Sequence, residues 1–349
     1  MAKRVLVAMS GGVDSAVAAL VLQEQGYNVE GITLRMLRNT ATDRAIADAR
    51  QTADTLGIPH TVLDVCDYFE NTVIRRFADT YTAGRTPNPC VYCNAAVKFG
   101  ALYDYAILKE EFDFLATGHY ARVIHRGDDG APHLLRGKDA KKDQSYMLCA
   151  VPSHVFRNVL FPLGDLDKPA VRALAKQRGF VSASAKESQD ICFVPDGDYA
   201  RYLQEERGIA SAPGNFVDTD GAVIGQHDGC IRFTVGQRKG LGMGFGKPMF
   251  VLAKDPQSGN VTLGDEAELF SSALVASEMN WFCNPAALPD GITAKARYSQ
   301  REAAVVVTPR DTAAMVEFAE PQRALTTGQA VVLYHGDEVL GGGTIEKVL

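Results

Sequence analysis

The residues with the clearest chemical meaning form a glycine turn near the N-terminus. Residues 10–15 read SGGVDS and lie between an apolar run, 5–9, that predicts a buried strand and residues 16–25, which predict a helix. Such a turn points backbone N–H groups and the positive end of the helix at one place, which suits a phosphate group. The motif lacks the lysine of a GxxxxGK[ST] loop and is not a GxGxxG dinucleotide fingerprint. We therefore expect a phosphate site of a different kind.

A second group of residues places two cysteines after a rigid loop. Residues 85–94 read RTPNPCVYCN, and the two prolines hold Cys90 and Cys93 near the start of a helix. A helix start and a nearby Arg85 or Lys98 are expected to lower the pKa of these thiols. Another cysteine, Cys192, lies 99 residues beyond Cys93.

The cysteine pattern alone leaves three interpretations open. Cys90 and Cys93 are either half of a structural zinc site or a redox dithiol. In the third interpretation they work together with Cys192, either as a nucleophile and its partner thiol or as the ligands of an iron–sulfur cluster. The remaining cysteines lie in apolar contexts and are expected in the core: Cys66, Cys149, Cys230 and Cys283.

Composition indicates a soluble globular protein of two or three domains. The chain has 349 residues, of which 46% are hydrophobic and 22% charged. No apolar run reaches the ~18 residues that span a bilayer, and residues 1–4 lack the features of a signal peptide. We expect a cytoplasmic protein without a membrane partner, and seven scattered cysteines argue against a disulfide framework.

Charge is unevenly distributed along the chain. The net charge of −6 argues weakly against a nucleic-acid partner, but residues 134–178 carry nine basic and four acidic side chains and so net +5. This segment is either a phosphate-binding face or a solvated helix face. Its basic residues are Arg136, Lys138, Lys141, Lys142, Arg157, Lys168, Arg172, Lys176 and Arg178.

The first part of the chain alternates strands with helices. Strands are expected at 5–9, 28–34, 58–65 and 114–117, and helices at 16–25, 43–56, 68–82, 97–111 and 169–178. This order predicts an α/β fold with a doubly wound, mainly parallel sheet. Ligands of such sheets bind at the carboxyl ends of the strands. The glycine turn and Gly118-His119 both follow strands, so one crevice is expected to hold both.

The second part has short β-type runs between glycine-rich turns. Strands are expected at 229–235, 249–254 and 260–264, and after residue 272 at 293–298, 303–308, 315–318, 330–334 and 339–345. The later strands predict a small β-barrel. The expected domains are a catalytic domain at 1–199, a small connecting domain at 200–268 and the barrel at 269–349.

The motifs together resemble a known family. SGGVDS is similar to the pyrophosphate loop of the ATP pyrophosphatase superfamily, whose members attach AMP to a substrate oxygen. The order of six motifs resembles the bacterial tRNA-specific 2-thiouridylases over nearly the whole chain. These motifs are SGGVDS (10–15), TPNPCVYCN (86–94), ATGHY (116–120), KDQSY (142–146), ICF (191–193) and GQRKGLG (236–242).

The resemblance implies a reaction and its cofactors. The enzyme would replace the C2 oxygen of the wobble uridine of tRNA with sulfur, using ATP and Mg²⁺. The residues implied to bind ATP are Ala8, Met9, Ser10, Gly11, Gly12, Val13, Asp14, Ser15, Leu34 and Gly118, with Asp14 also serving the Mg²⁺ or phosphate geometry. Those implied to contact tRNA are Asn88, His119, Lys142, Asp143, Gln144, Arg297, Tyr298 and Gln329.

The resemblance also implies how sulfur is handled. Cys192 would receive sulfur as a persulfide, Cys93 would be the nucleophile or resolving thiol, and the two would form a disulfide after transfer. The implied partners are the anticodon stem-loop of tRNA and a sulfur-carrier or cysteine desulfurase-linked donor. Adenylation makes physical sense, because the C2 carbonyl oxygen is a poor leaving group and its conversion to AMP makes it a good one.

Two departures from the family pattern leave alternatives open. Some relatives carry Asp where this chain has Cys90, so Cys90, Cys93 and Cys192 are alternatively the ligands of a [4Fe-4S] cluster, as in related tRNA thiolases. The loop after Leu34 is also short. The rival functions are an amidating ATP pyrophosphatase with a small-molecule substrate and a metal-stabilised RNA-binding module.

Overall fold

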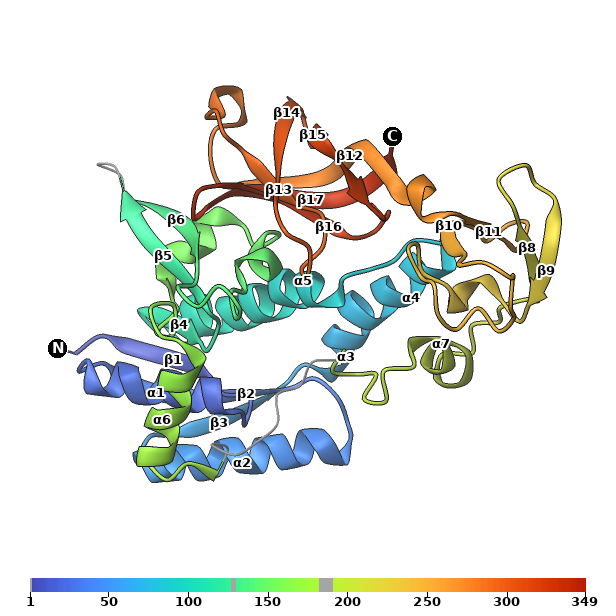
Figure 1. Cartoon of the computed structure of the whole chain (residues 1–349). Helices are drawn as coiled ribbons and strands as arrows, with labels where there is room; N and C mark the ends of the chain where they lie inside the picture. Colours follow the sequence, from blue (N-terminus) through green and yellow to red (C-terminus); the bar gives the residue numbers. More distant parts are fainter. Residues whose placement is uncertain (1, 127–129, 182–190) are drawn as a thin grey trace.

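The computed structural model describes residues 2–126, 130–181 and 191–349 (Figure 1). Its first part is a parallel sheet with the strand order β3-β2-β1-β4-β7. The strands are β1 (Arg4–Ala8), β2 (Asn28–Arg35), β3 (His60–Asp64), β4 (Phe114–Thr117) and β7 (Val159–Leu160). The helices α1 (Val13–Glu24), α2 (Thr40–Leu56) and α6 (Lys168–Gln177) pack beside one another. The expected doubly wound α/β fold is confirmed.

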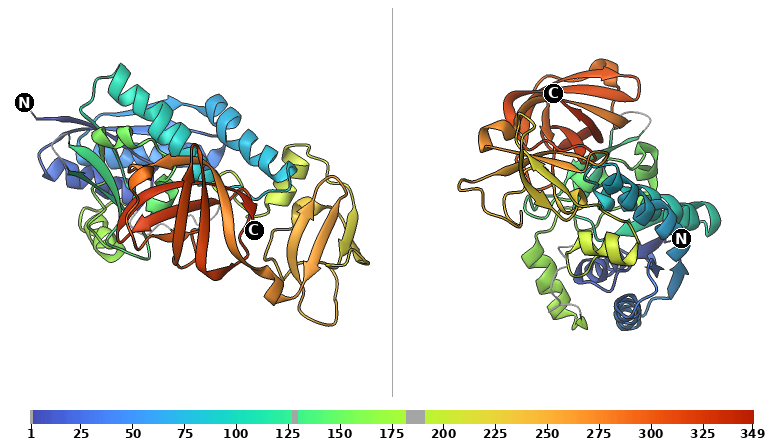
Figure 2. Two further views of the ribbon diagram at one scale, coloured as in Figure 1. Left: turned by 90° about the horizontal axis from the view of Figure 1, so that it is seen from above. Right: turned by 90° about the vertical axis from the view of Figure 1, so that its right-hand side faces the viewer.

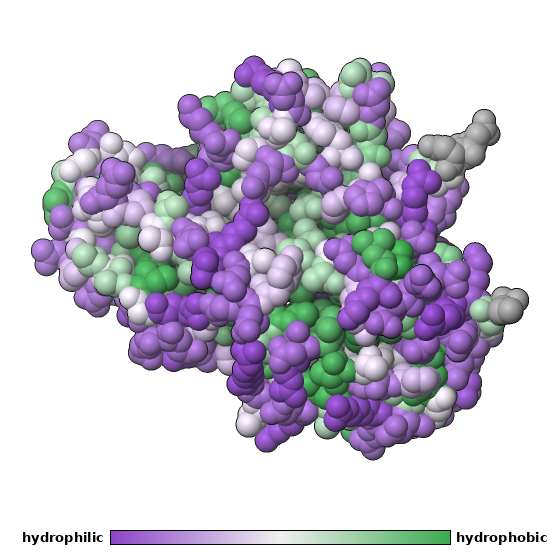
Figure 3. Space-filling view, turned by 180° about the vertical axis from the view of Figure 1, so that it is seen from behind, coloured by the Kyte–Doolittle hydropathy of each residue, from purple (hydrophilic) through white to green (hydrophobic). Residues whose placement is uncertain are grey.

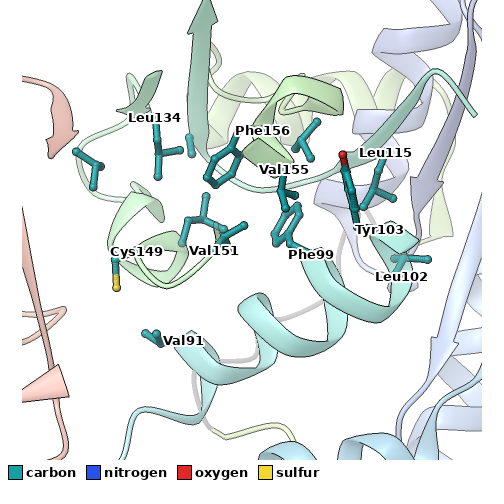
Figure 4. Close-up of a cluster of buried hydrophobic side chains, with 14 of the residues drawn as sticks. Val91, Phe99, Leu102, Tyr103, Leu115, Leu134, Cys149, Val151, Val155 and Phe156 are labelled. Atoms are coloured by element: carbon teal, nitrogen blue, oxygen red, sulfur yellow. The ribbon is translucent and has the colours of Figure 1, made fainter. Parts of the chain in front are cut away.

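Both faces of this sheet are buried, which explains the continuous apolar run at its first strand. Val5 and Val7 pack with residues of α1 in one cluster. Leu6 packs on the opposite face in a second cluster, which includes Phe99 and Leu115. Figure 4 shows the second cluster, in which Phe99 projects from its helix towards neighbouring buried side chains.

Two helical runs lie between the sheet and the barrel in Figure 1. The first comprises α3 (Cys66–Phe69), η1 (Glu70–Ile74) and α4 (Arg75–Thr82), and the second α5 (Pro89–Cys93), η2 (Asn94–Ala101) and η3 (Asp104–Lys109). The second begins earlier than the expected residue 97, because Asn88 is an extended N-cap and proline is favoured at the first helical position. Cys90 and Cys93 therefore belong to its first turns.

The middle of the chain forms a small sheet with the order β10-β11-β8-β9. Its strands are β8 (Gly214–Val217), β9 (Val223–His227), β10 (Phe250–Asp255) and β11 (Asn260–Gly264). The strand expected at 229–235 is wrong. A 3-10 turn, η8 (Cys230–Arg232), follows Gly229 at φ 143°, and the alternating burial of Ile231 and Phe233 comes from packing into two clusters.

The expected β-barrel forms the C-terminal part, and pairing of β12 with β17 closes it. The strands are β12 (Phe270–Trp281), β13 (Thr293–Lys295), β14 (Ala303–Arg310), β15 (Ala313–Arg323), β16 (Ala330–His335) and β17 (Glu338–Val348). A hairpin of β5 (Ala121–Arg126) and β6 (Ala131–Arg136) extends its sheet, since Leu135 pairs with Glu338. Figure 2 shows the barrel above the α/β layer and the middle domain to one side.

Short helices complete the described chain. They are η4 (Ser145–Leu148), η5 (Ser153–Asn158), α7 (Tyr199–Arg201), η7 (Tyr202–Glu206), η9 (Glu266–Leu269) and η10 (Pro285–Ala287). Within the described ranges, no helix has the length and apolar character to cross a membrane. On the face seen from behind, apolar residues gather towards the middle and polar residues dominate the periphery (Figure 3).

Candidate active site

The glycine turn connects β1 to α1, and hydrogen bonds of its own Ser15 hydroxyl stabilise its conformation. The Ser10 backbone N–H donates to Ser15 Oγ at 3.0 Å, and Ser15 Oγ–H donates to the Gly12 carbonyl at 3.0 Å. Gly11 has φ 76°, and a Cβ there would lie 2.5 Å from the carbonyl oxygen of Ala45 in α2. These contacts fix the turn in a conformation that only glycine fits at this point.

The turn has the properties of an anion site. Helix α1 begins after Gly12 without a side-chain cap, so the orphan N–H groups of its first turn have no partner from a capping side chain. A Cβ on Gly12 would meet only Ser10 Oγ, at 3.4 Å. The residues present therefore fit the phosphates of a nucleotide, with Ala8, Met9 and Val13 as the apolar frame around the turn.

Strand β4 ends directly against this turn. A Cβ on Gly118 would lie 2.8 Å from the carbonyl carbon of Asp14 and 2.9 Å from the backbone nitrogen of Ser15. Gly118 thus permits a close backbone contact with the turn. Leu34, the other residue implied to line the adenosine pocket, lies near the end of the neighbouring strand β2.

Asp14 has two partners that the sequence analysis did not identify. Lys168 Nζ lies 2.7 and 2.8 Å from its two carboxylate oxygens, and the Tyr120 hydroxyl donates to Oδ1 at 2.8 Å. Lys168 comes from the start of α6, 154 residues further along the chain. Only the +5 charge of its segment marked this lysine in the sequence, and the GHY motif marked Tyr120.

The three cysteines converge next to the sheet. Cys93 and the residues flanking Cys192, Ile191 and Phe193, belong to one apolar cluster. The sulfurs of Cys90 and Cys93 are near enough to raise the pKa of Cys192. All seven cysteines lie within the described residues and are free thiols.

The thiol pKa values differ from expectation. Burial raises the pKa of Cys93 and of Cys90, and burial together with the two other sulfurs raises the pKa of Cys192 to about 11. Cys90 and Cys192 are exposed residues, but neighbouring protein atoms crowd their sulfurs and weaken the hydration of a thiolate. The expected lowering of the pKa is therefore wrong: Lys98 acts in that direction, but burial dominates.

Lys98 is a cation whose charge affects the pKa values of the three cysteines and of His119. It lowers the pKa of Cys90, Cys93 and Cys192 against burial, and it reinforces burial in lowering the pKa of His119 well below the usual value. His119 is buried, and one ring nitrogen lies 2.7 Å from the Thr117 hydroxyl. The imidazole is therefore neutral at pH 7 and acts as a hydrogen-bonding group.

Three of the residues implied to bind tRNA hold the structure together. Both carboxylate oxygens of the buried Asp143 accept hydrogen bonds, from the backbone of Gly137 and from Ser145. Gln144 accepts from the backbone N–H of Tyr120 at 3.0 Å. The Tyr298 hydroxyl donates to the carbonyl of Asp143 at 3.1 Å, beside Lys142.

The barrel also holds the loop that carries the cysteines. Gln329 donates to the carbonyls of Thr86 and Pro87, both at 3.1 Å. Arg297 donates to the Val235 carbonyl at 3.0 Å and to the Thr326 hydroxyl, so it joins the barrel to the middle domain. Asn88 lies at the helix start, with its amide 3.8 Å from Met147 Sδ.

Several buried polar atoms around this loop have no hydrogen-bond partner among the residues that the structure describes. They are Thr86 Oγ1, Asn94 Oδ1 and Arg297 Nε. Such atoms are rare in native structures and commonly face water or a polar ligand. Asn94, directly after Cys93, is another residue that the sequence analysis did not assign.

Two further features bear on metals and ligands. No three His, Cys, Asp or Glu side chains among residues 2–126, 130–181 and 191–349 form a group that would hold a metal ion. A pocket of about 870 Å³ lies on the middle domain around His227, Asp228 and Arg232. None of the predicted site residues lines it.

Comparison with known proteins agrees with this geometry. A family model described as "tRNA methyl transferase HUP domain" matches residues 3–196, one described as "tRNA methyl transferase PRC-barrel domain" matches 201–265, and an "Aminomethyltransferase beta-barrel domain" matches 271–345. A protein from Carboxydothermus hydrogenoformans named tRNA-specific 2-thiouridylase MnmA is 48% identical over 99% of this chain and 98% of its own length. One of the same name from Symbiobacterium thermophilum is 46% identical over 100% and 93%.

The chain belongs to the tRNA-specific 2-thiouridylase family. Although the domain models are named for methyl transfer, the full-length relatives of this 2-thiouridylase family are named for thiolation. Among solved structures, the U34-tRNA thiolase NcsA from Methanococcus maripaludis with its [4Fe-4S] cluster has a TM-score of 0.35 and 18% identity, covering 58% of this chain and 66% of its own. A similarity this low carries no argument about the reaction.

The contact at Gly118 generates a first prediction for this member of the 2-thiouridylase family. Gly118→Ala would push the first turn of α1 away and is expected to weaken ATP binding and to destabilise the fold by about 1–3 kcal/mol. Gly244→Ala is the matched control, because its Cβ would meet no atom within 4 Å and its φ is not positive. Isothermal titration with ATP measures the effect, and equal affinities for the two variants would contradict it.

The raised pKa of Cys192 generates a second prediction. Its alkylation by iodoacetamide, followed by mass spectrometry of the Cys192 peptide, should accelerate from about pH 7 to about pH 10 without levelling off, because the thiolate is the reactive form. Lys98→Met should slow the reaction throughout, since it removes a cation that favours the thiolate. A plateau near neutral pH would show that the thiol is already ionised there.

Proposed function

We propose that this chain is an ATP-dependent tRNA uridine 2-sulfurtransferase that converts the wobble uridine of tRNA to 2-thiouridine. The observation that carries the proposal is the convergence of Cys90, Cys93 and Cys192 in the same domain as a glycine turn that fits phosphates. Full-length relatives named tRNA-specific 2-thiouridylase support the same activity.

The first step activates the uridine. The C2 oxygen attacks the α-phosphorus of ATP, the bond to the β-phosphate breaks, pyrophosphate leaves, and the proton of N3 passes to solvent. The turn at residues 10–15 holds the phosphates through backbone N–H groups, and Mg²⁺ accompanies the nucleotide. Anticodon loops are single-stranded, so turning the base into the crevice costs less than it would in a duplex.

The second step delivers sulfur. The terminal sulfur of a Cys192 persulfide bonds to C2, and AMP leaves with the electron pair of the C–O bond. The Cys93 thiolate then attacks Sγ of Cys192. The S–S bond to the transferred sulfur breaks, its electron pair goes to the thiouridine, N3 takes a proton from solvent to give 2-thiouridine, and a Cys93–Cys192 disulfide remains. A dithiol reductant and a persulfide donor, either a sulfur carrier or linked to a cysteine desulfurase, restore the enzyme in the cytoplasm.

The raised thiol pKa values place a requirement on this step. At pH 7 Cys93 is protonated, so it must lose its proton as it attacks. Lys98 stabilises the thiolate electrostatically. We assign Lys98 this part in the reaction, and the neutral His119 a hydrogen bond to the RNA.

The tRNA is proposed to cover the junction of the three domains. Tyr298 supports this location, because this residue is 38% exposed beside Lys142, and an exposed aromatic ring next to a cation suits contact with RNA. Asn88, His119, Lys142, Arg297, Tyr298 and Gln329 are the proposed contacts. Asp143 and Gln144 would act through the backbone that they hold.

Cysteine variants test the function. Wild-type protein should release pyrophosphate only when tRNA is present, and with a persulfide donor it should also release AMP and yield 2-thiouridine in nucleoside analysis. Cys93→Ser and Cys192→Ser should abolish the thiolated nucleoside but retain tRNA-dependent release of pyrophosphate, whereas Cys283→Ser, the control, should behave as wild type. AMP formation that requires ammonia and not tRNA would instead identify an amidating synthetase. Full cellular function of Cys93→Ser would favour a binding module.

Iron analysis tests the competing cluster mechanism. Because the described cysteines do not form a metal-binding group, we expect protein purified without oxygen to be colourless, iron-free and active with a persulfide donor. About four iron atoms per chain, with absorption near about 400 nm, would replace the persulfide route with a [4Fe-4S] cluster on Cys90, Cys93 and Cys192.

A further inference from the structure

The strongest unassigned feature is an ion pair at the glycine turn, in which Lys168 is buried and Asp14 is partly exposed. The Lys168 side chain is 9% exposed, and its ammonium nitrogen contacts both carboxylate oxygens of Asp14 at 2.7 and 2.8 Å. The Tyr120 hydroxyl occupies the same carboxylate at 2.8 Å, with the ammonium 5.7 Å from the centre of its ring. A buried lysine is costly unless its charge is needed or well paired.

The position of the pair argues against a purely structural role. Helices α1 and α6 already pack through apolar side chains, since Val171 and Ala175 share a buried cluster with Val17 and Leu20. The ion pair lies instead at the first turn of α1, next to the N–H groups that would receive a phosphate. An unpaired Asp14 carboxylate would repel a phosphate there, so a cation is needed beside it.

The turn itself supplies no such cation. SGGVDS lacks the lysine that ends a GxxxxGK[ST] loop and contacts the phosphates of its nucleotide. Lys168 is the lysine that the fold brings to the same place from another helix. Its long side chain ends at Asp14, two residues after Gly12.

We propose that Lys168 is the phosphate-binding lysine of this site, positioned by Asp14 and Tyr120. Its ammonium group neutralises the polyphosphate chain of ATP, and the two partners hold it at the mouth of the turn. The proposal rests on the proposed ATP-dependent function and adds to it a residue that binds the nucleotide. It makes the site a composite, with backbone donors from residues 10–15 and the charge from α6.

Nucleotide binding without turnover tests the proposal. Full-length Lys168→Met should bind ATP and inorganic pyrophosphate, each with Mg²⁺, about 10- to 100-fold more weakly than wild type in isothermal titration. Its affinity for adenosine should stay within about twofold, because adenosine carries no phosphate. Lys109→Met removes an exposed lysine of the same domain and should change none of the three affinities.

Other outcomes would overturn the proposal. Equal losses of affinity for ATP and adenosine would show that the variant disrupts the whole site. Unchanged ATP affinity with a lower melting temperature would show that the ion pair only stabilises the packing of α6 against α1. If Lys168→Met cannot be purified, Lys168→Gln, which removes the charge but keeps a polar side chain, should lower the ratio of ATP to adenosine affinity by about tenfold or more. An unchanged ratio in that variant would then refute the proposal.

The proposed function can fail separately. Wild-type protein that binds ATP yet releases no pyrophosphate with tRNA would refute the sulfurtransferase and leave the Lys168 result standing. If Lys168→Met, and not Lys109→Met, then lost affinity for ATP and pyrophosphate, Lys168 would still be identified as the phosphate-binding residue.

Discussion

The backbone contact between Gly118 and the first turn of α1 sets the position of everything else in the site. A side chain at residue 118 would collide with Asp14 and Ser15, so only glycine lets β4 end directly against α1, the helix that we propose binds phosphate. His119 and Tyr120 follow at once. Tyr120 reaches back to Asp14, and His119 lies within the electrostatic influence of Lys98. This close approach therefore links the glycine turn, through His119 and Lys98, to the three cysteines.

The barrel fixes the sulfur half by a similar contact. The Thr86 N–H donates to the carbonyl of Thr327 at 2.9 Å, and a Cβ on Gly328 would lie 2.9 Å from the Thr86 carbonyl oxygen. Gln329 adds two further hydrogen bonds. The loop before Cys90 is thus held by backbone from the last domain as well as by its own prolines, and sulfur chemistry depends on both ends of the chain.

Much of this arrangement could be predicted from the sequence, because its signals are local. SGGVDS and GHY each follow an apolar strand, so their meeting at one edge of a parallel sheet follows from the fold class. The later barrel strands were recognisable as short β-type runs between turns, although β12 was not, since its small and polar residues weaken the pattern. The strand expected at 229–235 failed because a 3-10 turn with two inward side chains imitates alternation.

What could not be predicted depends on contacts between distant segments. Lys168 looks like an ordinary first residue of a helix, and only the folded chain brings it to Asp14. The thiol pKa values likewise reflect how much protein surrounds each sulfur, which no motif encodes, so the expectation based on helix start and nearby cations had the wrong sign. The nearby cation correctly predicted one contribution to the thiol pKa, a lowering, whereas burial in the folded protein determined the net shift, which is a rise.

The hairpin of β5 and β6 has a consequence for how this architecture can vary. It leaves the α/β layer and continues the sheet of the barrel through the pairing of Leu135 with Glu338, while Arg122 reaches Asp337 at 2.8 Å. The barrel is therefore not a detachable appendage on a tether. A lineage that exchanged or lost it would have to rebuild an interior hairpin of the first domain at the same time, so the two modules are expected to be inherited together.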